Sequence, residues 1–192
     1  MNKNYFKIAA ILLFIGAITI SCGSRRNRST SVVEGAVEIV VPFSGAAYQT
    51  SDTHWRGRGN GSSIELAMAR NIAMQLARTE LATSIQATVT AVTERYGDQR
   101  QVQDNQLFQS RLQEMGRTVV NQQLNDVRTL GERTFREPNG RIRVYVALEM
   151  SRDAVRNAMI SSISADEMLR LDFDQHMFRR IFDEEMRNFQ NR

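Results

Sequence analysis

Apolar and polar positions divide the chain into an N-terminal apolar run, a polar stretch and a long region of strand and helix periodicity. A cationic start at 1–7 precedes the apolar run 8–20, and Cys22 follows two residues later. A charged start, about 7–15 apolar residues and small residues at the end are typical of a secretory signal peptide. A helix needs about 20 apolar residues to span a bilayer, so this run is too short for a permanent anchor. We therefore predict that residues 1–21 are a signal peptide.

The cysteine at the end of this run indicates a lipid-anchored chain. It resembles the acylated cysteine of bacterial lipoprotein signals; Ile20 and Ser21 fit that pattern, and Thr19 departs from it. The resemblance implies that Cys22 becomes the first residue of the mature chain and carries two or three acyl chains. Each buried methylene contributes about 0.8 kcal/mol, and one chain alone holds a protein only marginally. The alternative is a plain signal peptide with an incidental cysteine.

A polar stretch separates the cysteine from the rest of the chain. Residues 22–36 are rich in Ser, Arg, Asn and Thr, which predicts a flexible tether. The β-branched run 37–41, closed by a proline, predicts a first strand. The following loop-like segment ends in Gly57, Gly59 and Gly61. Alternating glycines before a helix are typical of a phosphate-binding loop, but no Lys-Ser/Thr pair follows and the spacing fits neither nucleotide fingerprint.

The longest periodic segment begins after these glycines. Ser62 and Glu65 have the spacing of a capping box. Apolar residues at helical spacing then predict one long helix that ends near Gly97 and buries this stripe. Three alanines, spaced four apart beside the stripe, would let the helix approach a sheet or another helix closely. The stripe is Ile64, Met68, Ile72, Leu76, Leu81, Ile85, Val89 and Val92, and the alanines are Ala69, Ala73 and Ala77.

Three more helices are predicted in the second half of the chain. The apolar pattern over 107–124 predicts the first of them, and a β-branched pair near its end leaves a change to strand open. Ser151 begins a short helix to about residue 160. The last helix is predicted to start at Ser164, with Glu167 as its capping partner. Its Met and Phe side chains suit a docking surface. We expect it to dock on its own domain, with a partner protein as the alternative.

A β-hairpin is predicted between these helices. Strands at 127–136 and 141–149 flank the turn 137–140, where Pro, Asn and Gly favour a tight reversal. Apolar residues alternate in the second strand with Arg141 and Arg143, so one face should be buried and the other should carry arginine.

Composition narrows the possible partners. With its single cysteine committed to lipid the mature chain forms no disulfide, and both lysines, Lys3 and Lys7, lie in the signal. The sequence pI is about 9.7, but the arginines nearly balance the acidic residues, which excludes a strongly basic nucleic-acid binder. Arginine offers a planar fork for phosphate and carboxylate groups. The candidate anion-binding residues are Arg56, Arg58, Arg141 and Arg143.

Residues suited to catalysis are few. His54 lies near Asp52 in the expected loop, while His176 has Asp172 and Arg180 at helical spacing, a pattern typical of surface ion pairs. The sequence has no His-x-x-x-His spacing for a metal and no free cysteine nucleophile. We therefore predict a non-enzymatic protein without a cofactor, and keep an enzyme built on the histidine–aspartate pair at 54 and 52 as an alternative.

Part of the chain resembles a known family. The pattern comprises Trp55, Gly57, Gly59 and Ser63, the alanine-rich helix from Ala67 to Ala82, and the strand from Tyr145 to Met150. It resembles the Lpp-twenty family of small bacterial envelope lipoproteins over roughly residues 55–150. That resemblance implies a compact α+β domain with a long helix on an antiparallel sheet, related to modules of flagellar-assembly lipoproteins. It implies no established catalytic residues.

These observations predict an α+β fold in which a long N-terminal helix packs on a small antiparallel sheet that includes the hairpin, with C-terminal helices. The α+β lipoprotein domain would span 37–163, and an amphipathic helix 164–192. The resemblance to lipoprotein signals implies lipid anchoring at the outer membrane, because Gly23 rather than Asp follows the cysteine. It implies a domain facing the periplasm, because the acidic tract that sends some lipoproteins to the cell surface is missing. The expected role is interaction or assembly with a protein partner of the envelope. A binding module for an anionic glycan or lipid head group is the alternative, and the oligomeric state is left open.

Overall fold

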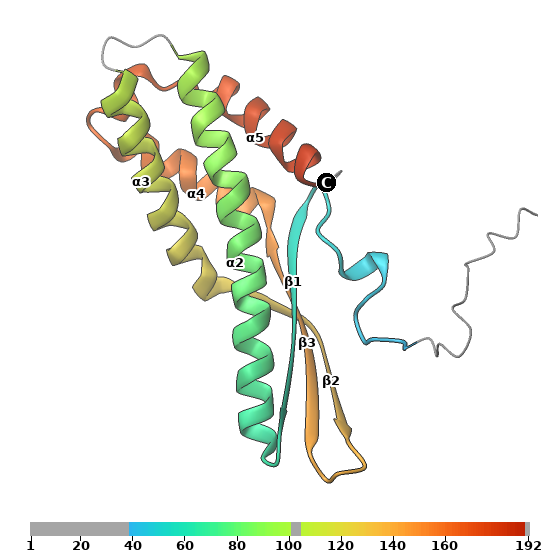
Figure 1. Cartoon of the computed structure of the whole chain (residues 1–192). Helices are drawn as coiled ribbons and strands as arrows, with labels where there is room; N and C mark the ends of the chain where they lie inside the picture. The colour runs from blue at the N-terminus through green and yellow to red at the C-terminus, as the bar shows by residue number, and fades with distance from the viewer. Residues whose placement is uncertain (1–38, 101–104, 191–192) are drawn as a thin grey trace, which may run out of the picture. The chain divides into compact units, whose positions relative to one another are not determined.

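The computed structural model describes residues 39–100 and 105–190. In the compact unit Val40–Arg192, an antiparallel sheet lies beside a long helix (Figure 1). The predicted α+β class is confirmed. Cys22 and the predicted tether lie outside the described residues. Among the helices of the described part, none has the length and apolar character needed to cross a membrane.

The sheet has three antiparallel strands in the order β1-β3-β2. The predicted hairpin is confirmed, because β2 pairs with β3 and the turn between them places Gly140 at a φ of +81°. The third strand pairs along the other side of β3, where Trp55 lies opposite Met150. The strands are β1 (His54–Ser63), β2 (Arg128–Arg136) and β3 (Ile142–Ser151).

Strand β1 corrects the prediction of a loop at 54–61. Its inward positions after Trp55 are glycines, so the apolar alternation by which a strand is normally recognised is missing from the sequence. The strand predicted at 37–41 is wrong over its described part, since 39–41 has no regular structure. A short 3-10 turn η2 (Ala46–Tyr48) lies between this segment and β1.

Helix α2 (Leu66–Gln99) lies directly on these glycines. A Cβ atom on Gly59 would stand 2.1 Å from the carbonyl oxygen of Ala73, far inside van der Waals contact. A Cβ atom on Gly57 or Gly61 would likewise stand 2.3 Å from the carbonyl oxygen of Ala77 or Ala69, respectively. The close approach predicted from the alanines is confirmed. Its partner is β1.

The apolar stripe of α2 is only half buried. Ile64 and Met68 are 76% and 52% exposed, and Ile72 and Leu76 are exposed as well. The second half of the stripe is fully buried, as predicted, at Leu81, Ile85, Val89 and Val92. The difference arises because the first half of α2 meets the sheet through its alanines, whereas its second half is also covered by other helices.

The start of α2 also differs from the prediction. Glu65 occupies the N-cap position, and no side-chain hydrogen bond caps the helix. Ser63 Oγ accepts a hydrogen bond from the Glu65 backbone N–H at 3.3 Å, so Ser62 does not form the predicted capping box.

The helices of the second half pack at one end of α2. The helix predicted at 107–124 stays helical through its β-branched pair, Val119 and Val120, so no strand begins there. The predicted start of the last helix at Ser164 is wrong, since this residue belongs to α4. That helix ends before Asp166, whose carboxylate accepts a hydrogen bond from the backbone N–H of Leu169 at 3.0 Å. The elements are α3 (Asn105–Gln123), α4 (Arg152–Ala165), η4 (Leu169–Asp172) and α5 (Gln175–Gln190).

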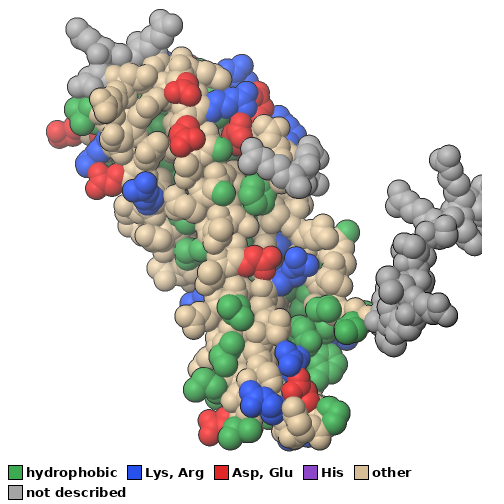
Figure 2. All heavy atoms as spheres, in the orientation of Figure 1, with side chains coloured by type: hydrophobic (Ala, Val, Ile, Leu, Met, Phe, Trp, Pro, Cys, Tyr) green, Lys and Arg blue, Asp and Glu red, His purple; other side chains and the backbone are tan. Residues whose placement is uncertain are grey.

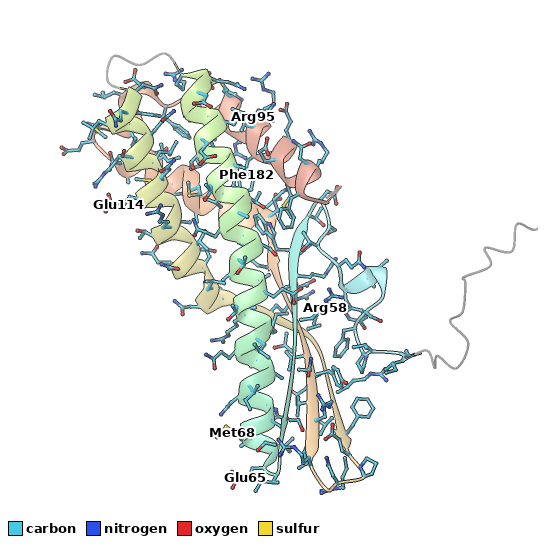
Figure 3. All side chains as sticks on the ribbon, viewed as in Figure 1. Arg58, Glu65, Met68, Arg95, Glu114 and Phe182 are labelled. Atoms are coloured by element: carbon cyan, nitrogen blue, oxygen red, sulfur yellow. The ribbon has the colours of Figure 1, made fainter. Side chains whose placement is uncertain are left out.

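Helix α5 docks on its own domain, as predicted. Figure 3 shows Phe182 between α5 and α2, and its ring meets that of Trp55 edge-on at 6.1 Å. The indole N–H of Trp55 donates to Thr88 Oγ1 at 3.2 Å, and the Tyr96 hydroxyl accepts the backbone N–H of Asp174 at 2.7 Å. Arg95 bridges to α5 through two carboxylates. The buried side chains of α5 are Phe178, Ile181, Phe182 and Met186, and the carboxylates are those of Glu184 and Glu185.

We predict that Gly59→Ala lowers the free energy of unfolding by about 3 kcal/mol, because its Cβ would overlap the Ala73 carbonyl. The measurement is urea unfolding followed by circular dichroism. Gly45→Ala is the control, since a Cβ there meets nothing within 4 Å, and it should change stability by less than about 0.5 kcal/mol. Equal stability of both variants would contradict the observed packing.

Candidate functional site

The candidate site is the sheet face opposite α2, which we call the open face. Side chains alternate along a strand, so residues between the inward glycines of β1 point to this face together with their cross-strand partners. Three of the four predicted arginines lie here, and the fourth immediately precedes β3. The open face comprises Arg56, Arg58, Asn60, Arg128, Arg133, Phe135, Arg143, Tyr145 and Glu149.

A buried carboxylate organises one end of the open face. Glu149 is only 4% exposed; its Oε2 accepts a hydrogen bond from Arg56 Nε at 3.3 Å, and its Oε1 accepts two from Nε and Nη2 of Arg128. Burial raises the pKa of Glu149, but the Arg128 hydrogen bonds and charge, with help from Arg56, outweigh burial and hold that pKa below its ordinary value. Arg56 also donates to the backbone carbonyl of Gln49 at 2.8 Å. Its guanidinium is therefore already committed to protein partners.

Arg58 lies at the free edge of β1 (Figure 3). Its backbone N–H donates to Glu80 at 2.6 Å, and its guanidinium lies 3.7 Å from the same carboxylate. This bond satisfies an edge donor that would otherwise be open to pairing with another strand. A hollow of about 210 Å³ borders the edge, lined among others by Pro42, Asn60 and Tyr145.

Arg141 and Arg143 lie at the opposite end of the sheet. Arg141 donates to the hydroxyl and the carbonyl oxygen of Ser62 at 3.1 and 2.8 Å. Arg143 pairs with Glu137 and donates to Asn60 Oδ1 at 3.1 Å. The cross-strand partners of Glu149 and Arg143 are six positions apart in β1, which corresponds to about 20 Å. The four predicted arginines therefore form two separate pairs.

The prediction from sequence missed the contribution of β2 to this face. Phe135 and Tyr145 meet edge-on, with ring centroids 5.7 Å apart, and Arg133 lies directly opposite Tyr145. The side chains of β2 alternate between the two faces of the sheet. Because the strand is almost wholly exposed, this alternation does not show in the sequence as an apolar periodicity. Gly131 is covered by Phe43, whose ring stands 2.7 Å from where a Cβ on that glycine would lie. The segment before β1 thus covers part of the open face.

The two residues of the predicted catalytic alternative lie at the start of β1 and in the bend before it, where the charge of His54 also acts on Glu149. His54 begins β1 rather than lying in a loop, and its Nδ1 lies 3.1 Å from Thr53 Oγ1. His176 lies at the start of α5, two residues after Asp174, whose backbone N–H bonds the Tyr96 hydroxyl near the C-terminal end of α2. Over residues 39–100 and 105–190, no group of three or more His, Cys, Asp or Glu side chains is placed to hold a metal ion.

Comparison with protein-family models, curated proteins and solved structures finds no match to this chain. The resemblance to the Lpp-twenty family therefore stays a prediction.

We predict that Glu149→Gln destabilises the fold by about 2 kcal/mol near neutral pH, because it removes the charged acceptor of two arginines. The folded state holds the Glu149 pKa below its unfolded value, so this stabilisation is complete above the ordinary glutamate pKa of about 4.3 and is lost as the pH falls through the folded pKa. The stability gap between the two proteins should close in acid. The measurement is urea unfolding across a pH series.

Glu167→Gln is the matched control, since this carboxylate is exposed and forms no ion pair among the described residues. It should change stability by less than about 0.5 kcal/mol at any pH. A Glu149→Gln gap that persists unchanged into acid would contradict the assigned ion pairs.

Proposed function

We propose that this chain is a lipid-anchored, non-enzymatic lipoprotein of a bacterial envelope that acts in interaction or assembly. One observation carries the proposal: Cys22 directly follows a cationic start and a short apolar run. This run is too short for a permanent membrane helix, and acylation would supply the anchor that it lacks. The outer membrane, with the domain facing the periplasm, is the location that fits Gly23 after the cysteine.

The open face supports an interaction role for the folded domain. Ion pairs fix Arg56 and Arg128, so this end of the face is preorganised. Beyond it, Phe135 is 44% exposed beside Arg133, which has no carboxylate partner among the described residues. Exposed aromatic and arginine side chains are enriched at the energetic centres of protein interfaces. The partner that we propose is a protein of the envelope.

The alternative is a binding module for an anionic envelope glycan or lipid head group. The observation that favours it is that the Arg141 guanidinium donates to Ser62 and has no carboxylate to neutralise it among the described residues. Arg56 and Arg58 support it less, because Glu149 and Glu80 already neutralise them. An arginine–anion site would weaken steeply with ionic strength, whereas an aromatic contact would not.

The anchor is tested by Cys22→Ala, measured as intact mass and membrane fractionation in a bacterial host with a lipoprotein pathway. We expect the unsubstituted protein to start at Cys22 with added acyl mass and to stay in the membrane fraction through a high-salt wash, whereas the Cys22→Ala variant should leave it in that wash. Ser24→Ala, two residues away, should keep both acylation and location. An unacylated chain with Cys22 intact would contradict the proposal.

The interaction role is tested by chemical crosslinking in intact envelopes. We expect a discrete crosslinked protein partner that is reduced severalfold in a Phe135→Ser, Arg133→Gln variant, since both side chains lie on the proposed interface. Leu171→Ser with Arg170→Gln is the control, because these exposed residues lie in η4, outside the open face. Crosslinks that do not respond to the open-face variant would place the interface elsewhere, and recovery of lipid alone would reject the interaction role.

A further inference from the structure

One end of the sheet gathers exposed side chains of two kinds. The first turn of α2 and the hairpin turn lie at the same end (Figure 1), because Ser63 at the end of β1 pairs with Ile142 at the start of β3. Figure 3 shows Glu65 and Met68 at the start of α2, at this same end of the molecule. We call this region the turn end and define it as residues 62–68 and 133–143.

The first kind of side chain is apolar. Ile64 is 76% exposed, Met68 52%, Phe135 44% and Leu66 41%. Figure 2 shows hydrophobic side chains beside arginines at this end of the molecule. The folded core does not need these residues, since α2 meets the sheet through its alanines. Exposed apolar groups that cluster in this way are typical of an interaction surface.

The second kind is cationic. Arg133, Arg136 and Arg141 have no carboxylate partner among the described residues, and only Arg143 is neutralised, by Glu137. The one other acidic side chain of the turn end is that of Glu65. The N-terminus of the long helix α2 adds the positive end of its dipole here. The turn end therefore carries a net positive charge next to its apolar side chains.

We propose that the turn end docks on an anionic lipid surface. Such a surface presents phosphate groups directly above hydrocarbon, which matches arginines next to exposed apolar side chains. Ile64 and Met68 would enter the acyl boundary while the guanidinium groups contact phosphate oxygens. A second copy of the chain is a poorer occupant, because two turn ends would place arginine against arginine. The contact uses the folded domain alone and does not depend on acylation of Cys22. It shares Arg133 and Phe135 with the proposed protein interface, so these two residues serve one contact at a time.

The test uses chain 23–192, which lacks both the signal and the acylated cysteine. All buried apolar side chains of the described structure lie between Phe43 and Met186, so this chain retains the whole core. The measurement is flotation with phosphatidylcholine vesicles, with and without a minor fraction of phosphatidylglycerol. We expect partition onto the anionic vesicles only, weakening as salt is raised.

The charge arm replaces Arg133, Arg136 and Arg141 by Gln. Each arginine near an anionic surface contributes roughly fivefold, so we expect the partition coefficient to fall at least tenfold at low salt. The matched control replaces three exposed arginines outside the turn end, which changes the net charge equally and should retain most of the binding. These control residues are Arg117, Arg170 and Arg187.

The apolar arm combines Ile64→Ser with Met68→Ser, and we expect a fall of about tenfold. Leu171→Ser with Met168→Ser is its control, since Leu171 is 79% exposed on η4, far from the turn end. Thermal unfolding of every variant verifies the fold. If the triple arginine variant fails to fold, the apolar variant and the salt dependence of the unsubstituted chain still test whether the turn end binds the anionic vesicles.

Three results would overturn the proposal. One is no partition onto anionic vesicles. Another is equal loss in both arginine triples, which would mean that net charge alone binds. The third is full binding by the apolar variant, which would reduce the contact to anion binding without insertion. Because the tested chain lacks Cys22, each of these failures leaves the proposed lipid anchor untouched.

Discussion

The contact between β1 and α2 constrains the rest of the structure. Three glycines of the strand and three alanines of the helix bring the two backbones so close that the strand positions have no room for a Cβ atom. Close packing of this kind compensates for the absence of large apolar side chains through many short-range contacts. Larger side chains fill the space beside this seam, where Val144 and Val146 of β3 are buried next to the glycines, and at its end Trp55 packs against Phe182.

This packing also determines where function can reside. Beyond Trp55, the inner positions of β1 are glycines without side chains, and its polar residues project to the open face, where Glu149 and its two arginines form an ordered ion-pair network. The narrow alanine seam leaves the flanks of α2 uncovered, which explains why apolar residues such as Ile64 and Met68 are exposed. The close packing of α2 on β1 and the exposure of apolar side chains at the turn end therefore have the same cause, which is the use of glycine and alanine at the contact.

Sequence patterns predicted the elements that have ordinary periodicity. The long helix, the second helix and the hairpin follow the expected spacing, and the α+β class follows from them. Strand β1 could not be predicted, because Gly57 and Gly59 occupy its inner positions and erase the apolar alternation. The four-arginine set was predicted as one group, yet pairing with β3 separates its members by the length of the strand. Glu149 was missed because its burial results from two arginines that lie far from it in sequence.

The most direct test of this account is the proton–proton contact between β1 and α2. In a nuclear Overhauser spectrum, the Hα protons of Gly59 should show cross-peaks to the amide proton of Ala77, since a Cβ at that glycine would lie 2.5 Å from the Ala77 nitrogen. Matching cross-peaks should link Gly57 to Leu81 and Gly61 to Ala73. Their absence, with β3 still paired to β2, would mean that 54–63 does not lie under α2, and the explanation of both the open face and the turn end would fail.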